Sequence, residues 1–371
     1  MKRKILYIVN SDWFFISHRL PIGLKLLSLG YDVHLATSFS EDIEKLNSLG
    51  FKTHELKLDR FELNLFKSLR SFIQILRIVY KIKPEIIHSV TIKPVIFGGL
   101  ASRIYQKAIF VASISGLGYV FTNKNLTSYI LKFIVKKLYK LSLSQRKLKV
   151  IFQNKRDEDI LTKLCKLKNK DKVLIPGSGI DLDKFKPTLV DKDSNIILFA
   201  SRLLISKGII EFISCAKEFY GSGLRFVIAG KLDKDNPDCI GQEILEEEVK
   251  AGFVEYLGDV QNIKELILSA KVLLLPSYYG EGLPKILIEA AACGIPVITT
   301  NHPGCKDAII NNKTGLLVPI KDVQSLILAL KKLLRSKKLC KNMGEEARKL
   351  AIEKFDVNNV IKKHIEIYNQ F

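Results

Sequence analysis

Acidic residues are scarce in the first half of this 371-residue chain. Residues 1–190 hold 34 Lys and Arg against 15 Asp and Glu, whereas residues 191–371 hold 25 against 23. Residues 101–150 contain ten basic side chains and no acidic one. A one-sided basic half indicates an anionic partner, such as nucleic acid, a phosphorylated substrate or anionic lipid. A lysine-rich, solvated surface is the alternative, although it does not explain why the second half stays nearly neutral.

Long apolar runs and paired cysteines are also missing. Nowhere do roughly 18 uncharged apolar residues run together, so no transmembrane helix is expected. The six cysteines include no CxxC pair, and several lie in apolar runs. This pattern is typical of free thiols in a reducing cytoplasm and excludes a disulfide framework or a zinc site. With 47% hydrophobic and 26% charged residues, the composition is that of a globular protein.

Short apolar segments alternate with amphipathic ones along the chain. Lys4–Val9 and Phe110–Ser115 are predicted strands, and Ser17–Leu29 is a predicted amphipathic helix. A polar linker, KPTLVDKDSN at residues 186–195, interrupts the pattern, which restarts with a strand at Ile196–Ala200. Alternation of this kind predicts parallel sheets covered by helices on both faces.

The predicted fold class is α/β, with two tandem doubly wound parallel-sheet domains of the Rossmann-like kind. We expect a first domain at residues 1–188 and a second at 189–355. Residues 356–371 are expected to form a C-terminal helix that crosses back onto the first domain. Ligands bind beyond the carboxyl ends of the strands in such sheets, so the site is expected in a cleft between the two domains.

Two glutamates stand in an otherwise apolar stretch, YYGEGLPKILIEAAACGIPVITT, at residues 278–300. Glu281 follows a predicted strand in a Gly/Pro loop, and Glu289 lies inside the next helix. A carboxylate can accept two hydrogen bonds at once, which suits a vicinal diol such as a ribose. The alternative is structural: Glu281 caps the helix, and Glu289 snorkels to solvent or pairs with Lys285.

The same stretch predicts a helix N-terminus beside these glutamates. Pro284 fits the first turn of the helix, where its missing N–H costs nothing. The backbone N–H groups of Gly282 and Leu283 would then be available to an anion. A phosphate-binding helix start next to diol-binding carboxylates is the chemistry that a sugar nucleotide requires.

A pair of cations follows the first predicted strand of the second domain, in FASRLLISKGIIEF. Arg202 comes directly after the strand, and Lys207 opens the next helix. Arginine can bind phosphate oxygens bidentately, whereas lysine acts as a point charge. Ordinary surface charge is the alternative for both residues.

Signals for metals and redox cofactors are weak. Asp181 and Asp183 spell DxD, a pattern that holds a divalent metal in some sugar transferases, but no third ligand lies nearby in the sequence. No GxGxxG follows the first strand, which disfavours a dinucleotide oxidoreductase. We expect no metal site and no cofactor.

These motifs together resemble the family 4 glycosyltransferases with the two-domain GT-B fold. The likeness is strongest in E-G-L-P-K-x-x-x-E, from Glu281 to Glu289, and in A-x-G-x-P-V, residues 292–297. The resemblance implies metal-independent transfer, with retention, of a hexose or N-acetylhexosamine from a nucleotide diphosphate sugar. A UDP-sugar is the expected donor, and the nucleotide sugar is a substrate, not a cofactor.

The resemblance also implies roles for individual residues. Arg202 and Lys207 would neutralise the diphosphate leaving group, where charge develops in the transition state. Glu281 would contact the donor sugar as a third catalytic residue, and Glu289 would hold the ribose. The first domain would bind the acceptor and the second the donor. The backbone of the two residues after Glu281, Gly282 and Leu283, would contact the sugar and phosphates.

A narrower likeness lies in the first domain, in DWFFISHRLPIGLKLLSLGYDVHLAT, HSVTIKPVIFGGLAS and SGLGYVFT. These segments are similar to bacterial enzymes that extend saccharides on undecaprenyl diphosphate for O-antigen, capsule and other surface polysaccharides. The likeness implies acceptor binding by His18, Arg19, His88 and Lys93, although a structural role is the alternative for both histidines. Many relatives carry a histidine where this chain has Ser115, so no side-chain base is assigned.

The acid-free segment contains a candidate membrane surface. Its predicted helix carries Lys132, Lys136, Lys137 and Lys140 beside apolar residues, as a helix on an anionic membrane would. The predicted helix Leu65–Ile82 offers a second basic surface. We therefore expect peripheral attachment to the cytoplasmic face of the inner membrane, whereas a sheet-covering helix with solvated lysines is the alternative.

Two other functions compete with glycosyl transfer to a lipid. A nucleotide-sugar epimerase or hydrolase could use the same fold, but it needs no basic acceptor surface. A nucleic-acid-binding protein would explain the charge alone and predicts steeply salt-dependent binding. No recognisable nucleic-acid-binding module accompanies the charge, so no nucleic-acid partner is expected.

Overall fold

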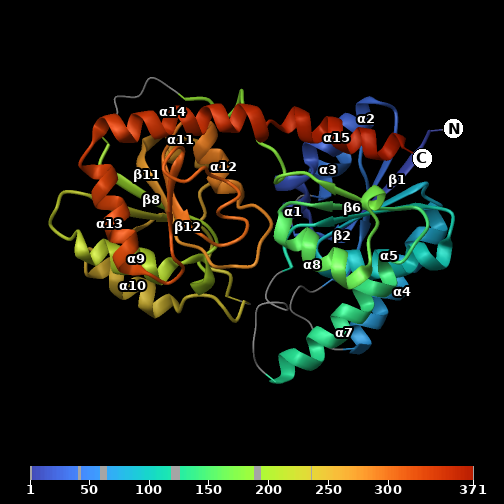
Figure 1. Cartoon of the computed structure of the whole chain (residues 1–371). Coiled ribbons are helices and arrows are strands. Elements are labelled where there is room, and N and C mark those ends of the chain that lie inside the picture. The colour runs from blue at the N-terminus through green and yellow to red at the C-terminus, as the bar shows by residue number, and fades with distance from the viewer. Residues whose placement is uncertain are drawn as a thin grey trace. The chain divides into compact units, whose positions relative to one another are not determined.

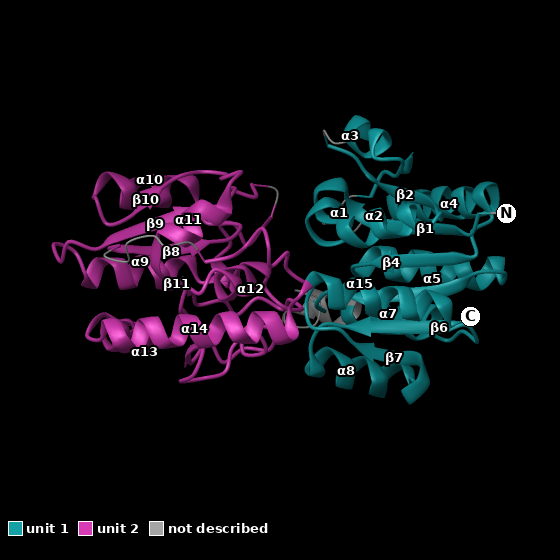
Figure 2. Cartoon of the chain, turned by 90° about the horizontal axis from the view of Figure 1, so that it is seen from above, with its two compact units in different colours: residues 1–178, 357–371 teal, residues 179–356 magenta. Residues whose placement is uncertain are grey.

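The computed structural model describes residues 2–40, 43–58, 65–117, 126–187, 194–234 and 236–370 (Figure 1). The chain forms two compact units, each an α/β domain with one parallel sheet. Unit 1 comprises residues 1–178 and 357–371, and unit 2 comprises residues 179–356 (Figure 2). The predicted fold class, two tandem Rossmann-like domains, is confirmed.

The sheet of unit 1 has seven strands in the order β3-β2-β1-β4-β5-β6-β7. The order reverses beside β1, which pairs with β2 on one side and β4 on the other, as in doubly wound sheets. The strands are β1 (Lys4–Ser11), β2 (Asp32–Ser38), β3 (Lys52–Glu55), β4 (Ile86–Val90), β5 (Ile109–Ile114), β6 (Leu148–Phe152) and β7 (Lys172–Leu174).

Both faces of this sheet are covered, because alternate residues of each strand point to opposite faces. In β1, Leu6 and Ile8 belong to one buried cluster, whereas Ile5, Tyr7 and Val9 belong to the other. The first cluster lies under α4 (Leu65–Ile82), α5 (Ile92–Tyr105), α7 (Leu126–Ser142) and α8 (Lys155–Cys165). The second lies under α1 (Asp12–His18), α2 (Leu20–Ser28), α3 (Ile43–Ser48) and α15 (Val357–Asn369).

One predicted helix of unit 1 is wrong in its extent. Instead of a single helix from residue 17 to 29, the structure has α1 and α2 separated by Arg19. Pro21 explains the break, because it has no N–H to donate to the carbonyl four residues earlier and its ring clashes there. The backbone of Arg19 accordingly leaves the helical region, with φ −132° and ψ −13°.

Unit 2 has a six-stranded parallel sheet in the order β10-β9-β8-β11-β12-β13. Its strands are β8 (Ile196–Ala200), β9 (Arg225–Ala229), β10 (Glu255–Tyr256), β11 (Ala270–Leu275), β12 (Val297–Thr300) and β13 (Gly315–Val318). Its helices are α9 (Ile209–Glu218), α10 (Gln242–Lys250), α11 (Ile263–Ser269), α12 (Lys285–Ala292), α13 (Val323–Leu334) and α14 (Lys337–Lys354). One hydrophobic core joins both faces of the sheet.

The structure divides the chain after Ser178, earlier than the boundary drawn from the polar linker. Ile180 and Phe185 are buried in the core of unit 2, and the N–H of Ile180 donates to the carbonyl of Phe355 at 2.7 Å. The chain returns to unit 1 as α15, whose Tyr368 is fully buried there.

Candidate functional site

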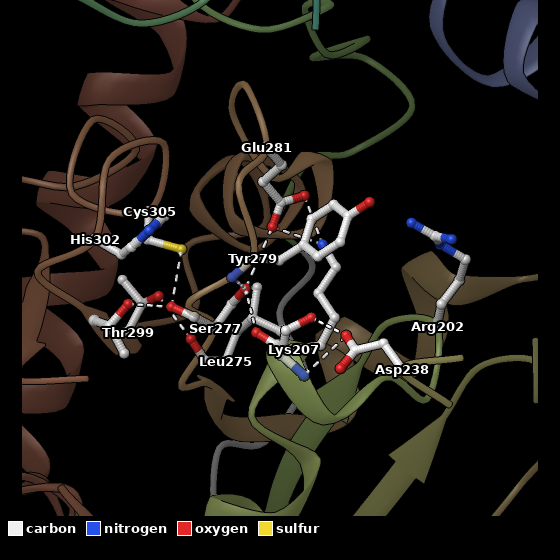
Figure 3. Close-up of polar contacts among 12 residues, drawn as sticks. Arg202, Lys207, Asp238, Leu275, Ser277, Tyr279, Glu281, Thr299, His302 and Cys305 are labelled. Carbon is white, nitrogen blue, oxygen red and sulfur yellow. Dashed lines mark hydrogen bonds and ion pairs between the residues drawn. The ribbon is translucent and has the colours of Figure 1, made fainter. Parts of the chain in front are cut away.

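The centre of the candidate site in unit 2 is an ion pair between Lys207 and Glu281 (Figure 3). Lys207 ends the short 3-10 turn Ile205–Lys207 that follows β8, and Glu281 lies in the loop after β11. The Lys207 Nζ donates to both Glu281 carboxylate oxygens, at 2.6 and 2.5 Å. Only 8% of the lysine side chain and 17% of the glutamate side chain are exposed. Removal of either partner would leave a largely buried, uncompensated charge.

Arg202 lies at the same edge of the sheet, on the loop after β8. Its Nη1 donates to Asp233 Oδ2 at 2.8 Å, and its guanidinium lies 5.9 Å from the ring centre of Tyr279. The Lys207 Nζ lies 5.3 Å from the same ring. Burial alone would lower the pKa of Arg202, but Tyr279, Asp233 and Glu281 outweigh it and raise that pKa. Two basic side chains therefore lie beside one aromatic ring.

Ser277 organises the loop that carries Glu281 (Figure 3). Its Oγ lies 3.4 Å from Glu281 Oε1 and accepts from the N–H of Tyr279 at 3.3 Å. Its carbonyl oxygen accepts from the hydroxyl of Thr300 at the end of β12. The loop is thus held from β11 and β12 together, which fixes the glutamate opposite Lys207.

Two glycines let neighbouring loops approach this site closely. Gly208, with φ +84°, would place a Cβ 2.4 Å from the carbonyl oxygen of Pro276. Gly304, with φ +87°, would place one 2.4 Å from the carbonyl oxygen of Gly282. Both contacts are with backbone, so a side chain at either position would displace a loop of the site.

Glu289 projects from the middle of α12, and 8% of its side chain is exposed. Its Oε1 lies 3.5 Å from Lys285 Nζ. This is the pair expected if Glu289 has a structural role. Burial raises the pKa of Glu289, and Lys285 offsets part of that rise. Pro284 is the N-cap residue of α12, one position earlier than predicted, and follows directly on Gly282 and Leu283. A buried, incompletely compensated carboxylate remains available to a hydroxyl donor.

Sequence reasoning missed Asp233, Ser277 and Tyr279. Asp233 follows β9, and only the observed strand order, with β9 beside β8, brings it to Arg202. Tyr279 lies within the quoted stretch, where an aromatic residue before a Gly-rich loop was the available signal. Ser277 acts through its hydroxyl and its backbone carbonyl on neighbouring loops, for which the sequence carried no signal.

Two of the predicted acceptor residues in unit 1, Arg19 and His18, contact neighbouring side chains and backbone of the same unit. Arg19 is 1% exposed and donates from Nη1 to the carbonyl of His18 at 3.0 Å. Burial lowers the pKa of Arg19, whereas Tyr7 and Tyr368 oppose that shift. The His18 ring stacks on Phe14, with 4.2 Å between ring centres.

His88 is fully buried, and both its ring nitrogens are engaged inside unit 1. Nε2 lies 2.7 Å from Ser113 Oγ, and Nδ1 lies 2.7 Å from the hydroxyl of Tyr368 on α15. That hydroxyl also lies 2.9 Å from the hydroxyl of Tyr7. Burial, with His364 and Arg19 nearby, lowers the pKa of His88 well below its usual value. Neither ring nitrogen of His88 is therefore left to contact an acceptor. This arrangement fits the alternative, a structural role for His88.

Helix α7 carries the predicted membrane lysines. Val135 and Tyr139 face the core of unit 1, whereas Phe133 and Ile134 are exposed. Lys137 Nζ lies 5.3 Å from the ring centre of Phe133. The half-buried or exposed lysines alternate with these residues along the outer side: Lys132, Lys136, Lys137 and Lys140. The outer side of α7 is thus both basic and apolar.

Three further features concern cysteines, apolar helices and acidic or metal-binding side chains. All six cysteines are free thiols, as predicted. Among the described residues, no helix is long and apolar enough to span a membrane. The same part of the chain holds no group of three His, Cys, Asp or Glu side chains arranged for a metal ion. Asp181 instead accepts hydrogen bonds from the N–H groups of Asp183 and Lys184, at 3.0 and 2.8 Å.

Two family models match the chain. "Glycosyl transferase 4-like" covers residues 4–154, and "Glycosyl transferases group 1" covers residues 181–350. Together with the fold, these two matches define a glycosyltransferase with the GT-B architecture. More narrowly, the chain belongs to the family 4-like glycosyltransferases that combine these two domains.

Curated relatives match over most of the chain. The Campylobacter jejuni N,N'-diacetylbacillosaminyl-diphospho-undecaprenol alpha-1,3-N-acetylgalactosaminyltransferase is 29% identical over 96% of this chain and 98% of the relative. The Escherichia coli UDP-Gal:alpha-D-GlcNAc-diphosphoundecaprenol alpha-1,3-galactosyltransferase is 24% identical over 82% of this chain and 80% of the relative.

Solved structures share the fold. A Rickettsia africae glycosyltransferase superposes with a TM-score of 0.78 at 20% identity, covering 100% of this chain and 98% of the other. Anabaena HepE in complex with UDP gives a TM-score of 0.79 at 14% identity, covering 100% of both chains. At such identities the likeness establishes the architecture.

Proposed function

We propose that the enzyme transfers a hexose or N-acetylhexosamine from a UDP-sugar to a saccharide linked to undecaprenyl diphosphate. Transfer proceeds with retention and contributes to O-antigen, capsule or another surface polysaccharide. The observation that carries the proposal is the convergence of Arg202, Lys207 and Glu281 at the carboxyl edge of the unit 2 sheet. Two curated relatives, named for acceptors on diphospho-undecaprenol, support the acceptor class.

The two cations suit a diphosphate leaving group. In the structure Lys207 is paired with Glu281, and Arg202 with Asp233, so both charges are held in place. A bound diphosphate adds oxygens that both cations can contact, and the negative charge that builds up as the sugar departs strengthens these interactions. Because two side-chain cations can neutralise the leaving group, we propose that no metal ion is needed.

Glu281, in the loop after β11, and Glu289, in α12, both contact the donor. Glu281 orients Lys207 through both carboxylate oxygens and contacts the donor sugar. Glu289 accepts hydrogen bonds from the ribose hydroxyls, which compensate its burial in α12. The backbone of Gly282 and Leu283 contacts the sugar and phosphates. The donor phosphate itself assists the acceptor hydroxyl, so the serine at position 115 is compatible with retention.

We further propose that the enzyme attaches peripherally to the cytoplasmic face of the inner membrane through α7. The outer side of this helix combines lysines with exposed Phe133 and Ile134. Apolar side chains of this kind insert at the headgroup boundary, while lysines bind anionic headgroups. Nucleic acid is not part of the proposal.

UDP release tests the proposed reaction. The purified enzyme is given a panel of UDP-sugars in EDTA, with and without a synthetic saccharide on farnesyl diphosphate. We expect UDP release with one donor and only in the presence of the acceptor. Equal release without acceptor would contradict the proposal and favour a hydrolase, and loss of activity in EDTA would contradict metal independence.

A further inference from the structure

A basic hollow of about 500 Å³ lies within unit 1, between α4 and α5. We name it the α4–α5 pocket. Its described lining residues include no carboxylate and combine four cations with hydroxyl groups: Lys57, Lys67, Arg70, Lys93, Ser38 and Ser68. Like charges gathered at one place repel one another, and a bound anion relieves that repulsion.

The pocket lies where parallel sheets bind ligands. Ser38 is the last residue of β2, and Lys93 lies in the first turn of α5, just after β4. Both positions lie at the carboxyl ends of strands, which form the ligand-binding edge of a doubly wound sheet. Of the predicted acceptor residues, Lys93 is the one that lines this pocket.

The chain is strained two residues before Lys93, at Thr91. Thr91, the N-cap residue of α5, has φ +75° and ψ 170°, a region that is essentially restricted to glycine. Its hydroxyl makes no cap hydrogen bond, and its Oγ1 is buried without a hydrogen-bond partner among the described residues. Such strain is concentrated at binding sites, where the surrounding structure holds one backbone geometry. The strained start of α5 therefore indicates a binding site.

Two of the pocket's cations have no counter-ion in the described part of the chain. Neither Lys57 nor Arg70 makes an ion pair there, and both side chains are exposed. Ser71 steadies this wall, because its Oγ donates to the carbonyls of Lys57 and Lys67 at 2.6 and 3.0 Å. Arginine binds phosphate oxygens bidentately, so Arg70 supplies geometry as well as charge.

A second hollow of about 400 Å³ continues along α4 and shares Lys57 and Arg70 with the first. Its lining adds three apolar side chains that are unusually exposed: Phe66 at 85%, Leu69 at 55% and Ile73 at 39%. Cations beside an exposed apolar row suit a ligand that joins an anionic head to a hydrocarbon chain. A free inorganic anion would leave this row unused.

We propose that the α4–α5 pocket binds the diphosphate of the lipid-linked acceptor and that the adjoining hollow receives the start of its hydrocarbon chain. This inference rests on the proposed function, because it presupposes an acceptor carried on a lipid diphosphate. It assigns acceptor recognition to Lys57, Lys67, Arg70 and Lys93 in place of the buried His88.

Direct binding tests the site without relying on catalysis. The full-length protein is saturated with UDP to occupy unit 2 and titrated with farnesyl diphosphate or inorganic diphosphate. We expect farnesyl diphosphate to bind at least about tenfold more tightly than inorganic diphosphate, because the prenyl chain buries apolar area. Arg70→Gln and Lys57→Gln should each weaken both probes, by about tenfold for the arginine. Leu69→Gln should weaken farnesyl diphosphate alone.

Lys81→Gln is the matched control, because Lys81 is exposed on the same helix and lines neither hollow. It should bind both probes as the wild type does, and UDP affinity should be unchanged in every variant. Equal affinity of Arg70→Gln and Lys81→Gln would overturn the proposal, and equal wild-type affinity for the two probes would overturn the lipid assignment. Pocket-dependent binding without sugar transfer would uphold this site while contradicting the proposed reaction.

Discussion

At the scale of single residues, the proposed reaction depends on cations that carboxylates hold in position. Lys207 is almost completely buried, yet both oxygens of Glu281 reach its ammonium group. An exposed lysine would lose conformational entropy when it bound a phosphate, whereas this one is already fixed. In the proposed reaction, the Lys207–Glu281 pair therefore offers the leaving group a positive charge that is already held in place.

Lys207→Ala is expected to lower kcat/KM by about 10²- to 10³-fold, because it removes charge stabilisation that develops in the transition state. Steady-state UDP release in the presence of acceptor is the measurement. Lys217→Ala is the control, since Lys217 forms a more exposed pair with Glu248 in the same unit. Similar kinetics for the two variants would remove Lys207 from the catalytic role.

Glu289→Gln is expected to separate stability from donor binding. Burial raises the folded-state pKa of Glu289 above its unfolded value, so the folded state binds the extra proton and wild-type stability falls as pH rises through that window. The glutamine variant should therefore gain stability relative to wild type as pH rises above about 4.5, and the gain should vanish at lower pH. Urea unfolding across pH measures this difference.

The same substitution should weaken UDP-sugar binding, because hydrogen bonds between a carboxylate and the ribose are replaced by neutral ones. The expected loss is about tenfold, measured as KM for the donor. A variant with unchanged KM would leave Glu289 a structural residue paired with Lys285.

The residues of the site differ in how far the sequence could predict them. Arg202, Lys207 and Glu281 were recognisable because each follows a strand in a distinctive local pattern, and the structure brings the three together. Asp233 and Ser277 have hydrogen-bond partners that are distant in sequence. Asp233 lies 31 positions from Arg202, and Ser277 lies 23 positions from Thr300. Such partners depend on strand order and loop contacts, which local patterns do not encode.

At the scale of elements, the alternation of apolar segments predicted the parallel strands well, because buried strands are short apolar runs between turns. Ends and breaks were predicted less well. The α1–α2 break required weighing Pro21 against a favourable helical pattern. The unit boundary required knowing that Ile180 pairs with Asp356 at the other end of unit 2.

Helix α15 is fastened to unit 1 by polar contacts as well as apolar ones. Tyr368 joins the hydroxyl of Tyr7 on β1 to the ring of His88 on β4. These three hydrogen-bonded side chains are fully buried, so each group depends on its partner for a hydrogen bond.

Tyr368→Phe is expected to destabilise the protein by about 1–3 kcal/mol, because it leaves the Nδ1 of His88 and the hydroxyl of Tyr7 short of a partner. Urea unfolding followed by circular dichroism measures the change. Acceptor KM should stay at the wild-type value in the folded protein. A raised acceptor KM with unchanged stability would return His88 to the acceptor site.

At the scale of the whole molecule, part of the excess of basic residues in the first half gathers at two places in unit 1. One is the outer side of α7, and the other is the α4–α5 pocket with its adjoining hollow. Both combine cations with exposed apolar side chains, which a nucleic-acid surface would not require. The charge asymmetry of the sequence thus agrees with the two proposals, an amphiphilic anion at the α4–α5 pocket and a membrane at α7.

Replacement of four lysines of α7 by glutamine (Lys132, Lys136, Lys137 and Lys140) should weaken binding to anionic vesicles by about a hundredfold or more, at roughly 1 kcal/mol per lysine near the surface. Flotation with phosphatidylglycerol-containing and neutral vesicles is the measurement. Four exposed lysines of unit 2 replaced together serve as the control: Lys332, Lys337, Lys338 and Lys341. Equal loss in both variants would indicate a general charge effect and contradict the role of α7.

The most direct test of glycosyl transfer to a lipid-linked saccharide is the identity of the product. The enzyme is incubated with UDP-sugars and a saccharide on a prenyl diphosphate, and the lipid fraction is analysed by mass spectrometry and by NMR of the new anomeric proton. The expected product is lipid-linked and heavier by one hexose or N-acetylhexosamine, with the anomeric configuration of the donor. An unextended acceptor across the whole donor panel, or an inverted linkage, would contradict it.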